Sequence, residues 1–89
     1  MSFRVLLHPK AARSLAKLQA SIRDRIQKAL KGLEDSPEVK GEQIKPSHFW
    51  RLRVGDYRAI YEIDHQAHRV VVLYIGHRKN VYDDFSRLL

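Results

Sequence analysis

Four arginines and one tyrosine are the side chains of this sequence best suited to binding a phosphodiester: Arg51, Arg53, Arg58, Arg78 and Tyr82. A guanidinium group stays protonated in proteins, and its planar N–H donors match the oxygens of a phosphate. A phenol ring offers a surface on which a nucleobase can stack. Grouped together, these side chains could surround one linkage of an RNA strand. Ordinary alternatives exist, because Arg78 could pair with Asp83 or Asp84, and Tyr82 could pack a helix onto a sheet.

Three of the arginines lie in residues 48–62, which are predicted to form a β-hairpin. Apolar and polar residues alternate on both sides of Gly55-Asp56, a pair typical of a type II′ turn. The resulting register places Arg53 directly opposite Arg58. One face is apolar and carries Trp50, Leu52, Val54, Tyr57, Ala59 and Tyr61. The other face carries Arg51, Arg53, Arg58 and Glu62.

Arginines in opposed positions destabilise a sheet by roughly 0.2–1 kcal/mol. A hairpin that tolerates them is suited to an anion that binds between them, since guanidinium groups favour phosphate. The alternative is that charged side chains prevent an edge strand from pairing with other chains. Both interpretations stay open on these residues alone.

The remaining elements are predicted from periodicity and from helix-start signals. We expect a strand at residues 3–7, helices at 10–18 and 21–33 with Ser21 as the second N-cap, and a surface connection at 34–47. Residues 69–75 are apolar on both faces, which indicates an internal strand beside the N-terminal one, and residues 81–89 are predicted to be helical. The order β-α-α-β-β-β-α describes one α+β domain over residues 1–89. Its sheet has four mainly antiparallel strands, with an αα-hairpin on one face and a short C-terminal helix.

The composition favours an anionic partner and a cytoplasmic location. The formal net charge of +7 suits nucleic acid, an anionic membrane surface or an acidic protein. The basic outer face of the second helix, formed by Arg23, Arg25, Lys28 and Lys31, is typical of a solvated helix. There is no cysteine, no apolar run of about 20 residues and no apolar N-terminus of signal-peptide length. His65 and His68 lack further ligands at defined spacing, so we expect no metal and no cofactor.

The chain resembles the RelE branch of the RelE/ParE superfamily of toxin–antitoxin toxins. The resemblance covers essentially the whole chain and rests on the β-α-α start, the hairpin at residues 49–58 and the tail at residues 75–82. It implies a RelE-like fold and a ribosome-dependent endoribonuclease that cleaves mRNA. In that reaction the 2′-hydroxyl attacks the adjacent phosphate and leaves a cyclic phosphate and a free 5′-hydroxyl.

The resemblance also implies roles for individual residues. Arg51 and Arg53 fall on basic positions of a strand, Arg58 and Arg78 on phosphate-binding arginines, and Tyr82 on the C-terminal tyrosine. Further candidates for RNA contacts are Lys45, His77 and Lys79. RelE-type proteins often have lysine where this chain has Arg51 and Arg53, and arginine is not a credible general base. The base could be Tyr82 as phenolate, His77 or a group of ribosomal RNA.

The partners that the resemblance implies are a cognate RelB-like antitoxin, the ribosome and mRNA, with operator DNA bound only through the antitoxin complex and no membrane. An acidic or amphipathic antitoxin segment would lie across the sheet or along the αα-hairpin. Two alternatives remain. One is a ParE-like toxin that binds DNA gyrase without chemistry of its own, and the other is an inactive toxin that serves as an antitoxin-binding co-repressor.

Overall fold

The computed structural model describes residues 2–87, and its elements follow the predicted order with additions between the second helix and the hairpin. The predicted elements are β1 (Arg4–Leu7), α1 (Pro9–Ala16), α2 (Ala20–Lys31), β3 (Trp50–Val54), β4 (Tyr57–Asp64), β5 (Arg69–His77) and α4 (Val81–Ser86). Residues 88 and 89 of the helix predicted at 81–89 lie outside the described residues. The additions are η1 (Gly32–Glu34), α3 (Pro37–Lys40) and β2 (Glu42–Gln43). The sheet has five strands in the order β1-β5-β4-β3-β2, in which β1 is parallel to β5 and the other pairs are antiparallel.

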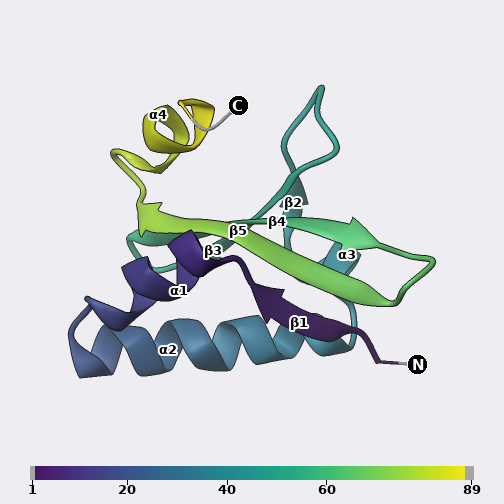
Figure 1. Ribbon diagram of the computed structural model, residues 1–89, viewed down its shortest axis with the longest axis horizontal. Helices are drawn as coiled ribbons and strands as arrows, with labels where there is room; N and C mark the ends of the chain where they lie inside the picture. Colours follow the sequence, from purple (N-terminus) through teal and green to yellow (C-terminus); the bar gives the residue numbers. More distant parts are fainter. Residues whose placement is uncertain (1, 88–89) are drawn as a thin grey trace.

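Helices α1 and α2 form the predicted αα-hairpin and cover one face of the sheet, whereas α4 lies on the other face (Figure 1). Pro9 starts α1, where its missing N–H costs nothing, and His8 Nδ1 accepts a hydrogen bond from Lys10 N at 3.2 Å. The prediction that Ser21 is the N-cap of the second helix is wrong. Helix α2 starts at Ala20 with Gln19 as N-cap, because alanine is a strong helix former and nothing in the sequence stops the helix at Ser21.

The prediction of a plain surface connection at residues 34–47 is also wrong. This segment contains α3 and the edge strand β2, which pairs Glu42 with Arg51 and Gln43 with Trp50. Both residues of β2 are exposed, so the segment has no apolar alternation from which a strand could be predicted. The four-stranded sheet of the prediction therefore gains a fifth strand.

The hairpin has the predicted register, with Arg53 opposite Arg58 and Arg51 opposite Ile60. Gly55 has a φ of +59°, as the first central residue of a type II′ turn requires. The apolar face packs with the two helices in a core that includes Leu52, Ala59 and Tyr61. On the opposite face, Val81 and Phe85 of α4 pack on Ile60 and form a second, smaller cluster. Helix α4 thus covers part of the arginine-bearing face.

Tyr61 anchors the segment that carries β2. Its buried hydroxyl donates a hydrogen bond to the carbonyl oxygen of Pro37 at 2.6 Å, and burial raises the pKa of this phenol to about 12. The phenol therefore stays protonated and keeps donating at neutral pH. Gly41 lies directly against the Tyr61 hydroxyl, so glycine is required for close approach rather than for an unusual φ.

Gly41→Ala should destabilise the fold by about 1–3 kcal/mol, because overpacking a filled contact forces neighbours to move. A Cβ at residue 41 would clash with the Tyr61 hydroxyl and lie 2.8 Å from the carbonyl oxygen of Arg51. Gly32→Ala is the matched control, since a Cβ added at residue 32 would have no neighbouring atom within 4 Å. Urea unfolding measures both variants, and equal midpoints would contradict the proposed anchor.

Candidate functional site

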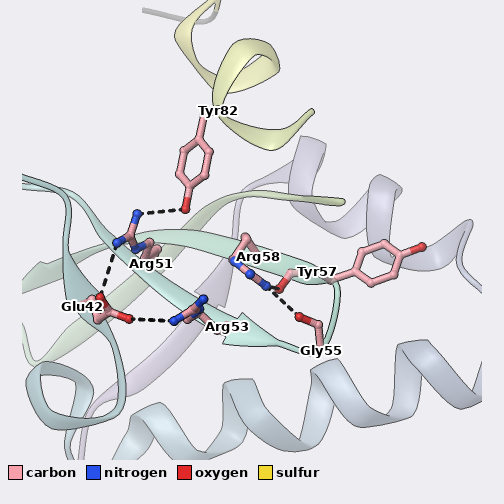
Figure 2. A network of polar contacts seen from close by, with 7 residues as sticks. All are labelled: Glu42, Arg51, Arg53, Gly55, Tyr57, Arg58 and Tyr82. Atoms are coloured by element: carbon pink, nitrogen blue, oxygen red, sulfur yellow. Dashed lines mark hydrogen bonds and ion pairs between the residues drawn. The ribbon is translucent and has the colours of Figure 1, made fainter. Parts of the chain in front are cut away.

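Six side chains surround an open hollow of about 480 Å³ on the sheet face that carries α4. They come from β3, β4, the segment after β5, and α4, and are Arg51, Arg53, Arg58, Arg78, Lys79 and Tyr82. The structure therefore brings together all five residues predicted to act on a phosphodiester, and adds one of the three predicted RNA contacts. Figure 2 shows Tyr82 extending from α4 toward Arg51, with Arg53 and Arg58 nearby on the sheet.

Arg58 is the most buried cation of the described residues, with 8% of its surface exposed. Its Nη1 donates to the carbonyl oxygens of Gly55 and Tyr57, each at 2.8 Å (Figure 2). Within residues 2–87 it forms no ion pair with a carboxylate. Burying a charge is costly unless the charge is paired, so a guanidinium held only by neutral carbonyls is suited to an incoming anion.

Arg51 lies between Tyr82 and the edge strand β2. Its Nη1 donates to the Tyr82 hydroxyl oxygen at 3.2 Å, and its Nη2 donates to Glu42 Oε2 at 3.3 Å. The hydrogen bond with Tyr82 raises the pKa of Arg51, burial opposes this effect, and Glu42 adds to the rise. The Nε atom is buried and has no hydrogen-bond partner among the described residues. This N–H is therefore free to donate to a water molecule or to a bound anion.

Glu42 is the site residue that the sequence did not reveal. One carboxylate oxygen contacts Arg51 as above, and the other lies 3.7 Å from Arg53 Nη1 (Figure 2). It was missed because residues 34–47 carry no strand signal. The opposed arginines were the one indication in the sequence that an acidic residue lies nearby, because a carboxylate from an adjacent segment reduces the repulsion between like charges.

Arg78 is positioned by the β3–β4 turn. Its backbone N–H donates to the carbonyl oxygen of Asp56 at 2.7 Å, and its Nε lies 3.5 Å from Asp56 Oδ1. This contact replaces the alternative ion pair with Asp83 or Asp84. Helix α4 begins at Val81, so Arg78 and Tyr82 meet through the turn at residues 78–80 rather than along one helix face.

Two of the predicted RNA contacts do not line the hollow. His77 pairs with Tyr57 on β4, and their rings contact edge to face at 5.5 Å on the side of the sheet that faces the helices. Lys45 is exposed in the loop between β2 and β3. His65, which was considered as a metal ligand, has its Nε2 atom 3.9 Å from Glu38 Oε1. Residues 2–87 contain no group of three or more histidines or carboxylates that could hold a metal, and no helix that could span a membrane.

Comparison with solved structures gives the same fold. The chain of the RelBE2 toxin–antitoxin complex from Mycobacterium tuberculosis matches with a TM-score of 0.79 and 27% identity, over 88% of this chain and 100% of that chain. A RelE–RelB complex from Pyrococcus horikoshii OT3 matches with a TM-score of 0.71 and 26% identity, over 88% and 97% of the two chains. A free mutant form of E. coli RelE, 23% identical over 100% of each chain, matches with a TM-score of 0.77 and supports the fold alone.

Comparison with curated proteins gives no significant match. Residues 5–82 match the model of the ParE toxin family of type II toxin–antitoxin systems. This match covers the sheet, the αα-hairpin and the first residues of α4. Together with the structural matches, it shows that the chain belongs to the ParE toxin family within the RelE/ParE superfamily, and is a toxin of a type II toxin–antitoxin system.

Proposed function

We propose that this toxin is a RelE-type endoribonuclease that cleaves mRNA on the ribosome and so inhibits translation. The observation that carries the proposal is Arg58, a buried guanidinium that has no carboxylate partner within residues 2–87 and that lines a hollow with three further arginines. Because ribosomes are its site of action, the protein would work in the cytoplasm.

The reaction converts one phosphodiester into a cyclic phosphate. The 2′-oxygen forms a bond to phosphorus, the bond from phosphorus to the 5′-oxygen breaks, and the leaving oxygen takes up a proton. Arg58 and Arg78 would hold the phosphate, while Arg51 and Arg53 would stabilise the charge that develops on its oxygens. Tyr82 would stack on or orient the reacting nucleotide.

Glu42 is our candidate for the group that accepts the 2′-hydroxyl proton. None of the four arginines can do so. His77 lies on the other side of the sheet, against Tyr57. Glu42 contacts Arg51 and Arg53, so a phosphate bound by these arginines would lie close to its carboxylate. Carboxylates are common general bases in enzymes.

The antitoxin would bind a different surface. A groove of about 660 Å³ between β1 and the helices is lined mainly by aliphatic residues, among them Val5, Leu7, Leu15 and Leu30. Its charged lining consists of two bases, Arg23 and Lys31, and one acid, Glu34. An amphipathic segment with acidic residues fits this combination of apolar floor and basic side chains. We propose a RelB-like antitoxin as this partner, and operator DNA as a partner only of the complex.

Arg78→Ala should abolish growth arrest and lower mRNA cleavage by about 10²–10³-fold, as expected for a lost transition-state donor. Primer extension on a translated message measures the cleavage. Arg87→Ala is the matched control, because Arg87 is exposed and does not line the hollow. Unchanged arrest and cleavage in Arg78→Ala would reject the assignment.

Cells that express the parent chain distinguish between the rival functions. DNA damage from stalled gyrase with intact mRNA would favour a ParE-like toxin. No growth arrest from a correctly folded parent chain would favour a co-repressor without catalytic activity.

Glu42→Gln should slow cleavage by about 10²–10⁴-fold, the usual contribution of a general base. The affinity for RNA should stay the same or rise, since the amide no longer competes with phosphate for Arg51 and Arg53. Single-turnover cleavage on programmed ribosomes, measured together with RNA affinity, tests both. If Glu42→Gln binds RNA more tightly but cleaves it at the parental rate, Glu42 is only a counterion of the arginines and not the general base.

A further inference from the structure

The turn at residues 78–80, which joins β5 to α4, carries two cations of the hollow, Arg78 and Lys79. Both side chains are exposed, and within residues 2–87 the one ion pair that either forms is that of Arg78 with Asp56. Long exposed side chains hold a ligand in one geometry only when the backbone that carries them is fixed. The conformation of this turn therefore decides where the two cations meet a phosphate.

All three backbone N–H groups of the turn are hydrogen-bonded. Arg78 N donates to the carbonyl oxygen of Asp56 at 2.7 Å, and Asn80 N donates to the carbonyl oxygen of His77 at 3.0 Å. Lys79 N donates to the imidazole Nδ1 of His77 at 3.2 Å. His77 thus supplies two of the three acceptors, one from its backbone and one from its side chain. An imidazole accepts through Nδ1 when the ring is neutral and its proton is on Nε2.

The imidazole ring of His77 is held on the side of the sheet opposite the hollow. It is partly buried and contacts the Tyr57 ring edge to face, with the ring centroids 5.5 Å apart. Figure 2 shows the Tyr57 side chain directed away from Arg51 and Tyr82. The His77 side chain does not line the hollow, yet its Nδ1 atom contacts the backbone that carries two of the cations.

A second histidine forms the same local hydrogen bond away from the hollow. His8 Nδ1 accepts from Lys10 N, also at 3.2 Å, at the start of α1. Neither of these residues lines the hollow. The chain therefore contains two histidines that each accept from the N–H two residues later, and in one of them the bond lies beneath the cations of the candidate site.

We propose that His77 is a positioning residue, which fixes Arg78 and Lys79 against the scissile phosphate through the hydrogen bond that its Nδ1 accepts from Lys79 N. It touches no substrate and transfers no proton. This role deepens the proposed function and rests on it. Because a misplacement of about 1 Å can slow a reaction about 10²-fold, one local hydrogen bond can matter more for cleavage than for folding.

The test compares His77→Asn with His77→Gln, since both variants remove the ring and its contact with Tyr57. Asparagine carries an oxygen on Cγ, where histidine carries Nδ1, and commonly accepts from the N–H two residues later. Glutamine carries its oxygen one bond further out. Single-turnover cleavage on programmed ribosomes should stay within about threefold of the parent in His77→Asn and fall about 10–10²-fold in His77→Gln. Equal rates in the two variants would overturn the proposal.

Hydrogen exchange of the Lys79 amide measures the bond independently of cleavage. In the parent chain this amide should exchange about 3–10-fold more slowly than in an unstructured peptide, as expected for one hydrogen bond. His77→Asn should keep this protection and His77→Gln should lose it. Exchange at the peptide rate in the parent would overturn the proposal even if neither variant folds.

His8→Gln is the matched control, because it breaks the same kind of bond at α1. It should leave cleavage within about twofold of the parent, as expected for a surface change away from the site. A loss as large as that of His77→Gln would show that cleavage follows general stability, and the positioning role would be wrong.

A double-mutant cycle shows whether His77 acts through the two cations. In the background Arg78→Ala/Lys79→Ala, His77→Gln should slow cleavage by less than about a further twofold, because the side chains that it positions are absent. A full further loss would show that His77 acts by itself and would overturn the proposal. If Arg78→Ala alone cleaves as the parent does, the proposed nuclease fails. If it loses cleavage while His77→Asn and His77→Gln remain equal, only the positioning role fails.

Discussion

The two hydrogen bonds from Arg58 Nη1 to the carbonyl oxygens of Gly55 and Tyr57 hold a charged group inside the sheet without neutralising it. This arrangement needs the tight β3–β4 turn, which the positive φ of Gly55 permits. The same turn contacts Arg78 through Asp56. The local backbone of one hairpin therefore positions both arginines that we assign to the phosphate.

The rest of the fold supports this hairpin from both sides. The αα-hairpin packs on the apolar face through the core around Leu52 and Tyr61, and α4 supplies Tyr82 on the other face. Tyr61 also fixes the segment that brings Glu42 to Arg51. Glu42 and Asp56 contact three of the arginines that surround the hollow, while Arg58 has no carboxylate partner within residues 2–87.

The sequence predicted what depends on local pattern and missed what depends on contacts between distant segments. The alternation around Gly55-Asp56 was sufficient to give the strand register residue by residue, and with it the face that carries Arg51, Arg53 and Arg58. Strand β2 has two polar residues and no period, so neither it nor the position of Glu42 could be predicted. The start of α2 was misplaced because alanine is a strong helix former, so the helix begins one residue before the capping signal at Ser21. His77 was predicted to contact RNA because it precedes Arg78 in the sequence. The alternation of side chains along β5 places it on the opposite face of the sheet.

The most direct measurement of the central claim follows the guanidinium group of Arg58 by nitrogen-15 NMR during titration with a 2′-O-methyl dinucleotide, which cannot be cleaved. The account predicts that the resonances of Arg58 and Arg78 shift together at saturation while that of Arg87 does not. Binding that shifts only arginines of the αα-hairpin, such as Arg13 and Arg23, and leaves Arg58 unchanged would contradict it.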